Sequence, residues 1–293
     1  MFRVLDLYSG VGGLSYGFAK VYGSDKVLGI DIGKWQVINY RKNVSHNVIR
    51  ANLLTFTPEG EFDIIIGGSP CEPFSQLNIT DKKYERHPLY PTLPRFYEIV
   101  KLKKPIVFIH ENVPKAKEYV KKAIKRIKLH RDYYISMAKI NYAEFGVGCS
   151  RKRLFTVGVR KDYQFNIIND LLELKEPGPT LRQCISKYVN MPMNPKINHV
   201  WRESKRNGVF FSFQVGLEWD KPLKGFGNPE KAWVWLPDGS RIISVRELMA
   251  CMGFPESFIL NPLTPLREMY EMIADSVSPY FSLKLAKVVK KYV

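Results

Sequence analysis

The sequence predicts an α/β fold in which a largely parallel sheet carries helices on both faces and a small irregular unit is attached. Three observations lead to this prediction. Short apolar segments alternate with segments of helical period over the first 160 residues, as in sheets whose parallel strands are joined by helical crossovers. The pattern weakens over 161–240, where Pro, Gly, Asn and aromatic residues accumulate. Helical period returns after residue 241.

The expected elements follow in chain order. Apolar segments predict seven strands, at 2–6, 27–30, 48–49, 62–66, 105–110, 133–140 and 154–159. Apolar residues at helical spacing predict helices at 13–22, 34–43, 93–101, 115–129, 244–252, 265–273 and 279–292. The chain therefore divides into a main domain at 1–160, a small region at 161–240, and C-terminal helices at 241–293 that return to the main domain.

The composition is typical of an intracellular globular protein. Of 293 residues, 45% are hydrophobic and 25% are charged. No apolar run approaches the roughly 18 residues of a membrane span, and the N-terminus enters a strand without a secretory signal. The four cysteines are far apart and form no CxxC pair, so we expect neither a metal site nor a disulfide framework. Cys184 and Cys251 are expected to be small buried apolar residues.

The net charge of +17 favours a polyanionic partner such as a nucleic acid. A proteome that is generally rich in lysine would produce the same excess. The charge therefore indicates a class of partner and needs support from motifs.

Two segments indicate a nucleotide-like ligand at the carboxyl edge of the sheet. The first predicted strand runs into DLYSGVGGL at residues 6–14, where glycines allow a sharp turn and close approach of a ligand. Asp31 ends the second strand, where folds of this kind hold ribose hydroxyls. The turn lacks both the P-loop and the GxGxxG patterns, and a purely structural glycine turn is the alternative.

Three further segments carry candidate chemistry. GGSPC at residues 67–71 breaks the fourth strand and presents Cys71, whose thiol needs a positive neighbourhood or a suitably placed acid or base. The five histidines are scattered, so a Cys–His hydrolase is poorly supported. Glu111 follows the fifth strand, close to Cys71 if the two strands are neighbours; capping of a helix is its alternative role. Arg151 and Arg153 are suited to bind phosphate or carbonyl oxygens. Their alternative role is that of a solvated basic turn.

In order and spacing, these segments resemble the cytosine-5 DNA methyltransferase family. The match runs through residues 6–13, 67–71, 111–113 and 151–153, and continues at 219–222, 244–247 and 252–258. The resemblance covers residues 1–160 and about 219–290. It implies a Rossmann-like sheet that binds S-adenosylmethionine, releases S-adenosylhomocysteine as product, and works beside a small target-recognition domain.

The resemblance also implies roles for residues. Cys71 would attack carbon 6 of a flipped cytosine, Glu111 would protonate ring nitrogen 3, and Arg153 would hold the base carbonyl, with Arg151 supporting the loop or a phosphate. The predicted cofactor-binding residues are Tyr8, Gly10, Gly12, Gly13, Leu14, Asp31, Ile32, Asn52, Leu53, Pro70, Ser276 and Val277. The predicted nucleic-acid contacts are Ser75, Arg86, Arg202, Lys205 and Arg206.

The chain departs from the family pattern at several positions. Glu72 replaces the usual glutamine after the nucleophile, and its carboxylate is expected to raise the pKa of Cys71. Asn52 replaces the usual aspartate, Cys149 replaces the usual glutamine, and Ala274-Asp275 replaces the usual Gly-Asn. The recognition region at about 161–218 is also short, which predicts a short target or help from a partner because each base edge needs its own side chain.

The expected substrate is double-stranded DNA, acted on by a monomer in the cytoplasm at the nucleoid, without membrane contact. A cognate restriction endonuclease or another specificity partner is a further expectation. Two alternatives stay open. One is the same chemistry on tRNA, and the other is a nucleic-acid-binding homologue that has lost turnover.

Overall fold

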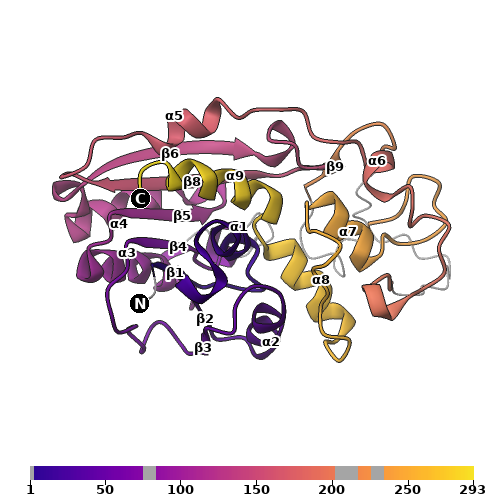
Figure 1. Ribbon diagram of the computed structural model, residues 1–293, viewed down its shortest axis with the longest axis horizontal. Coiled ribbons are helices and arrows are strands. Elements are labelled where there is room, and N and C mark those ends of the chain that lie inside the picture. The colour runs from indigo at the N-terminus through magenta and orange to yellow at the C-terminus, as the bar shows by residue number, and fades with distance from the viewer. Residues whose placement is uncertain (1–2, 75–83, 202–216, 226–233) are drawn as a thin grey trace.

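A seven-stranded mixed sheet forms the centre of the computed structural model, which describes residues 3–74, 84–201, 217–225 and 234–293 (Figure 1). Its strands are β1 (Val4–Leu7), β2 (Val27–Asp31), β3 (Val48–Arg50), β4 (Ile64–Gly68), β5 (Val107–Asn112), β6 (Tyr133–Asn141) and β8 (Lys152–Arg160). Their spatial order is β3-β2-β1-β4-β5-β8-β6. The first five are parallel, and β8 runs antiparallel to both of its neighbours. All seven predicted strands are present, and the α/β prediction is confirmed.

Two strands continue further than the sequence suggested. The glycine pair was expected to break the fourth strand, yet Gly67 and Gly68 pair with His110 and Glu111 inside the sheet. Glycine is required there because a Cβ at Gly67 would lie 2.2 Å from the Leu7 carbonyl oxygen. Likewise, β5 extends through Asn112. The polar residues at the strand ends therefore have positions set by the sheet's backbone hydrogen bonds.

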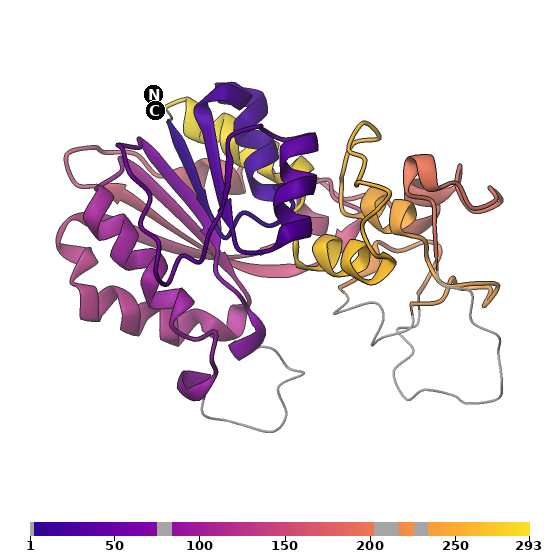
Figure 2. The same ribbon diagram turned by 90° about the horizontal axis from the view of Figure 1, so that it is seen from below.

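Helices cover both faces of the sheet (Figure 2). They include α1 (Gly13–Tyr22), α5 (Ile167–Leu172) and α9 (Pro279–Lys290) on one face, with α3 (Thr92–Lys103) and α4 (Lys117–Ile127) on the other. Strand side chains alternate between the two cores: Ile64 and Ile66 belong to the first, and Ile65 to the second. Helix α2 (Lys34–Asn43) packs beside β2 and β3.

The C-terminal helix closes against the start of the chain. A Cβ at Gly17 of α1 would lie 2.2 Å from the Ser282 carbonyl carbon, so the two helices approach at backbone distance. The Gly17 amide donates to Ser282 Oγ at 3.2 Å, and that hydroxyl donates to the Leu14 carbonyl. The start of α9 is thus bound directly to α1, the helix that follows the glycine-rich segment.

A second lobe lies at one end of the sheet, at the right of Figure 1. It contains α6 (Leu181–Ile185), α7 (Val245–Cys251), α8 (Leu266–Asp275) and the short strand β9 (Leu223–Lys224), which pairs with β7 (Cys149–Ser150). Helix α5, although it falls within 161–240, packs against α9 on the sheet side. No helix in the described ranges is long and apolar enough to cross a membrane.

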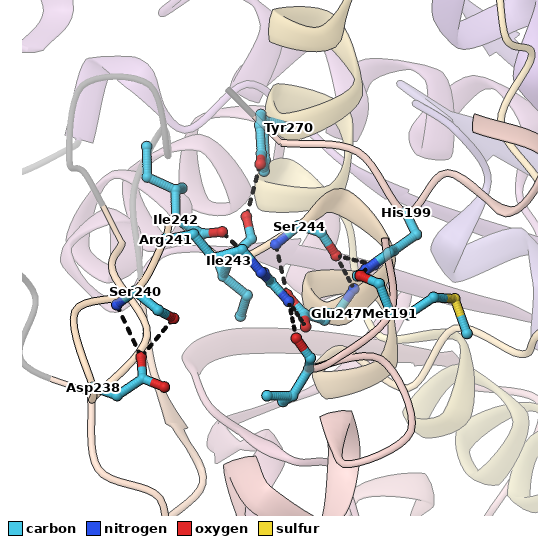
Figure 3. Close-up of polar contacts among 11 residues, drawn as sticks. Met191, His199, Asp238, Ser240, Arg241, Ile242, Ile243, Ser244, Glu247 and Tyr270 are labelled. Atoms are coloured by element: carbon cyan, nitrogen blue, oxygen red, sulfur yellow. Dashed lines mark hydrogen bonds and ion pairs between the residues drawn. The ribbon is translucent and has the colours of Figure 1, made fainter. Parts of the chain in front are cut away.

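A buried polar network organises this lobe (Figure 3). Glu247 has no exposed surface and accepts two hydrogen bonds of 2.7 Å from the Arg241 guanidinium. Ser244 and Glu247 also form a capping box at the start of α7. The Ser244 hydroxyl contacts His199 Nδ1 at 2.9 Å, and the Arg241 guanidinium lies 4.4 Å from the centre of the Trp201 ring. Several chain segments are therefore held together at one ion pair.

Glu247→Ala should destabilise the protein strongly. The substitution leaves the Arg241 cation, whose side chain is 13% exposed, without its carboxylate, and losing one partner of a buried pair costs about 3–5 kcal/mol. Denaturant unfolding followed by circular dichroism measures the change. The matched control is Glu218→Ala, which removes exposed ion pairs to Lys221 and Lys224 and should cost less than about 1 kcal/mol. Equal losses in the two variants would contradict the structural role of the network.

Candidate functional site

A cavity of about 410 Å³ opens at the carboxyl edge of the parallel strands, where α/β sheets place their ligands. Residues from the ends of β1, β2, β4 and β5, the start of β8 and the end of α8 line it. It brings together all four predicted catalytic residues and all predicted cofactor-binding residues except Gly12. Gly12 does not line the cavity and is the residue directly before α1, with φ of 92°. A Cβ at this position would lie 2.5 Å from the Val44 side chain.

The glycine turn and Asp31 form one rigid unit. The Asp31 carboxylate accepts hydrogen bonds of 2.8 Å from the amides of Gly10 and Gly33. Burial raises the pKa of Asp31, and these backbone donors oppose that rise. Tyr8 adopts φ of 62°, a left-handed conformation rare for a side chain of this size, and its hydroxyl donates to the Thr92 carbonyl at 3.0 Å. The turn is thus held in a strained shape from both sides.

Three lining residues show that this end of the cavity suits a ligand with polar and apolar parts. The Ser9 hydroxyl is buried and has no hydrogen-bond partner among the described residues. Ile32 is 61% exposed, which leaves an apolar side chain open to a ligand. Asn52 is exposed as well, and its Oδ1 already accepts the Leu54 amide at 3.0 Å. The cavity therefore offers one unsatisfied donor and an apolar wall.

Hydrogen bonds from β5 fix the turn that carries Cys71. The Asn112 side-chain amide donates to the Ser69 carbonyl at 3.0 Å and to its hydroxyl at 3.1 Å. His110 Nε2 contacts the same hydroxyl at 3.0 Å, and His110 Nδ1 contacts the Tyr97 hydroxyl at 2.9 Å. Burial lowers the pKa of His110 to about 3, so its imidazole is neutral. His110, left in the sequence analysis as one of five scattered histidines, supports the cysteine turn from behind.

Glu111 and Arg153 meet because β8 runs antiparallel to β5. Asn112 pairs with Leu154 across these strands, so Arg153 lies beside the end of β5. Arg153 Nε contacts Glu111 Oε1 at 2.9 Å, and both side chains are largely buried. Burial raises the pKa of the Glu111 carboxyl, and the cations of Arg153 and Arg151 oppose that rise. The register thus places a carboxyl group and a guanidinium together in the cavity.

The environment of Cys71 keeps its thiol protonated. Burial is the largest of the causes that raise the pKa of Cys71 to about 12; the charges of Asp275 and Glu72 contribute to the rise, and Arg153 opposes it. The expected effect of Glu72 is thus present, but Asp275 has the larger influence. In the sequence Asp275 is a departure from the family pattern, and its position directly before Ser276 and Val277 is the signal that it lies in the cavity.

The remaining predicted residues fall into two groups. Ser75, Arg202, Lys205 and Arg206 lie outside the described residues. Arg86 is exposed at the end of the η3 turn (Tyr84–Arg86) and does not line the cavity. Tyr84 and Phe74, which flank the segment 75–83, both pack on Tyr119 of α4 with ring centres 5.5 and 5.3 Å away. The described residues on either side of that segment, Phe74 and Tyr84, therefore belong to one aromatic cluster.

The other cysteines lie away from the chemistry. Cys149 and Cys251 are buried, and Cys184 is half-buried. The half-buried position of Cys184 contradicts the expectation that this residue is buried. The side chains of Cys184 and Cys251 contact each other. Within the described ranges no three His, Cys, Asp or Glu side chains are grouped as a metal site.

The chain is similar to known methyltransferases in sequence and in fold. The family described as C-5 cytosine-specific DNA methylase matches residues 2–210. Type II methyltransferase M.NgoFVII of Neisseria gonorrhoeae is 33% identical over 70% of this chain, which spans 57% of that relative's length. Type II methyltransferase M1.HphI of Haemophilus parahaemolyticus is 25% identical over 98% of this chain and 86% of its own. The solved S. pombe Dnmt2 methyltransferase has a TM-score of 0.71 at 18% identity, covering 99% of each chain.

His110→Gln should flatten the pH dependence of stability. A buried histidine whose pKa is lowered contributes stability above its unfolded pKa near 6.5, and this contribution is lost as the pH falls toward its folded pKa of about 3. Between pH 6.5 and 4.5 the native protein should therefore lose about 2 kcal/mol more than the variant. Urea unfolding at several pH values measures the slope. His130→Gln, at an exposed position, is the matched control and should keep the native slope; an unchanged slope in His110→Gln would refute this assignment.

Proposed function

This chain belongs to the C-5 cytosine-specific DNA methylases, and we propose that it transfers the methyl group of S-adenosylmethionine to carbon 5 of cytosine in double-stranded DNA. One observation carries the proposal: Cys71, Glu111 and Arg153 line the same cavity as the glycine turn and Asp31. A nucleophile, a carboxyl group and a cation thus face the space in which a methyl donor would bind.

The donor end of the cavity fits S-adenosylmethionine. Asp31, whose carboxylate is fixed by two backbone amides, would take the ribose hydroxyls, and the exposed Ile32 would contact the adenine. Ser276 and Val277, packed directly on Gly13, would enclose the methionine part together with the unsatisfied Ser9 hydroxyl. When bound, S-adenosylmethionine supplies an electrophilic methyl group.

The residues of the chain then carry the addition and elimination. Cys71 Sγ forms a bond to carbon 6, which makes carbon 5 nucleophilic. Glu111 delivers a proton to ring nitrogen 3, for which its raised pKa is suited, and Arg153 donates to the carbonyl oxygen of the base. Once carbon 5 is methylated, its proton leaves and the bond between sulfur and carbon 6 breaks. Extrusion of the base from the duplex, a few kcal/mol, precedes these steps.

The proposal also covers the substrate, the target-recognition region and the partner. DNA is favoured over tRNA by the family that matches residues 2–210 and by relatives whose names describe Type II methyltransferases. We place target recognition in residues 161–240, because the Arg241 network holds Trp201 directly before Arg202, Lys205 and Arg206. We further propose a monomer that acts on nucleoid DNA in the cytoplasm, with a cognate restriction endonuclease or another specificity partner.

Cys71→Ala should abolish methyl transfer, because no other described cysteine lines the cavity. The measurement is tritium transfer from labelled S-adenosylmethionine to duplex DNA and, in parallel, to tRNA. Cys184→Ala is the matched control and should keep native activity, while both proteins should bind S-adenosylhomocysteine in calorimetry. Transfer to tRNA alone would reject the DNA proposal, and transfer by Cys71→Ala would reject the nucleophile. Bisulfite sequencing of DNA from an expressing host then identifies the target.

Glu111→Gln should slow methyl transfer by about 10²–10⁴-fold, the range for loss of a positioned acid. The amide keeps a similar shape next to Arg153 but has no proton to deliver to ring nitrogen 3. Single-turnover kinetics at saturating S-adenosylmethionine separate this effect from donor binding. A native single-turnover rate would show that Glu111 is not the acid.

A further inference from the structure

The proposed reaction needs a base for Cys71 that the residues assigned so far do not supply. Burial and neighbouring carboxylates raise the pKa of the thiol to about 12, so the sulfur carries its proton when the substrate arrives. Glu111 is required as an acid, and the guanidinium of Arg153 cannot accept a proton because it is already protonated. Both ring nitrogens of His110 are engaged by Ser69 and Tyr97, and none of the other histidines lines the cavity.

Most carboxylates of the cavity are already committed. Besides Glu111, the cavity is lined by Asp6, Asp31, Glu72 and Asp275. Asp6 accepts the Ser15 hydroxyl at 2.5 Å, and Asp31 accepts two backbone amides. Within the described part of the chain, the side chains of Glu72 and Asp275 form neither a hydrogen bond nor an ion pair. A base for the thiol therefore has two candidates.

Asp275 is the better placed of these two. It is the last residue of α8, and the next two residues, Ser276 and Val277, pack against Gly13 at the donor end of the cavity. Its side chain is exposed to the cavity that Cys71 also lines. Among the charged neighbours of the Cys71 thiol, Asp275 raises the pKa of the thiol more than Glu72 does. Asp275 therefore shares one cavity with the donor end and with the nucleophile.

We propose that Asp275 is the general base that accepts the proton of Cys71 Sγ as the sulfur adds to carbon 6 of the target base. The proposal rests on the proposed function. In this step the S–H bond breaks, the bond between sulfur and carbon 6 forms, and the electron pair of the ring double bond moves into the ring as Glu111 protonates nitrogen 3. When the bond between sulfur and carbon 6 later breaks, the sulfur recovers its proton from Asp275, nitrogen 3 returns its proton to Glu111, and the carbon 5 proton passes to water.

The electrostatics of the cavity favour this transfer. Burial raises the pKa of Asp275 to about 6, close to neutrality, where a general base is most effective. The charged groups that act on Asp275 are Glu72 from the η2 turn (Glu72–Phe74), Arg151 directly before β8, Arg153 near the start of that strand, and Glu271 from its own helix. Protonation of Asp275 also removes the negative charge that opposes the thiolate. Transfer of the proton therefore lowers the pKa of the very thiol that supplies it.

The test uses duplex DNA with 5-fluorocytosine at the target found by bisulfite sequencing. Fluorine replaces the carbon 5 proton, so the elimination is blocked and the complex with Cys71 survives denaturing electrophoresis. The rate of trapping at saturating S-adenosylmethionine then reports addition and methyl transfer alone. Asp275→Asn should trap at least about 100-fold more slowly than the native protein, whereas Asp275→Glu should recover most of the rate. Glu72→Gln, the matched control, should trap faster, because it removes a charge that opposes the thiolate.

A second measurement separates a base from a simple charge. Alkylation of Cys71 by iodoacetamide without DNA, followed by mass spectrometry of its peptide, should be faster in Asp275→Asn because the thiol pKa falls. Faster alkylation with slower trapping supports the proposal. The proposal is overturned if Asp275→Asn traps faster than the native protein, or if Glu72→Gln traps slowly while Asp275→Asn does not.

If Asp275→Asn fails to bind S-adenosylhomocysteine, the native protein provides the test through its pH profile. Trapping by the native protein should then fall with one ionisation near pH 6 as the pH is lowered, and a flat profile from pH 5 to 8 overturns the proposal. No trapping by the native protein under any condition would instead show that the proposed function is wrong.

Discussion

Antiparallel pairing of β8 with β5 is the constraint on which the cavity depends. In a sheet of parallel strands, the residues that begin a strand lie at the edge opposite the residues that end its neighbour. Because β8 is reversed, its first residues reach the carboxyl edge, and Arg153 contacts Glu111 at 2.9 Å. The same edge holds the turn with Cys71 through hydrogen bonds from Asn112 to Ser69. One strand direction therefore brings a cation, a carboxyl group and a thiol together.

Poor solvation gives this cavity its chemical character. Burial raises the pKa values of Glu111, Cys71 and Asp275, so each group holds a proton more tightly than it would in water. Such groups are suited to exchange protons with a bound nucleobase, and their charges act over short distances with little screening. The ion pair between Glu111 and Arg153 limits the rise for the acid. The site therefore combines proton-holding groups with a fixed cation, as addition to a heteroaromatic ring requires.

The second lobe obtains its order from polar contacts as much as from apolar packing. The fully buried Glu247 joins Arg241 to the first turn of α7, and Ser244 joins that turn to His199. Trp201 packs against both Arg241 and His199. Among the described residues of this lobe, helices are short and strands are few, so a shared ion pair holds together segments that are distant in the chain.

The amino-acid sequence was enough to predict the α/β class, all seven strands of the main sheet, and the four catalytic candidates, because apolar periodicity and strand-end motifs are local signals. It could not show that Gly67 and Gly68 stay within β4, since the close approach of the Leu7 carbonyl that demands glycine comes from a neighbouring strand. Nor could it show that His110 supports the Ser69 turn or that Asp275 lines the same cavity as Cys71, about two hundred positions earlier in the chain. These features follow from the folded structure alone, because burial and the charges of distant residues, which set the pKa of each group, exist only once the chain has folded.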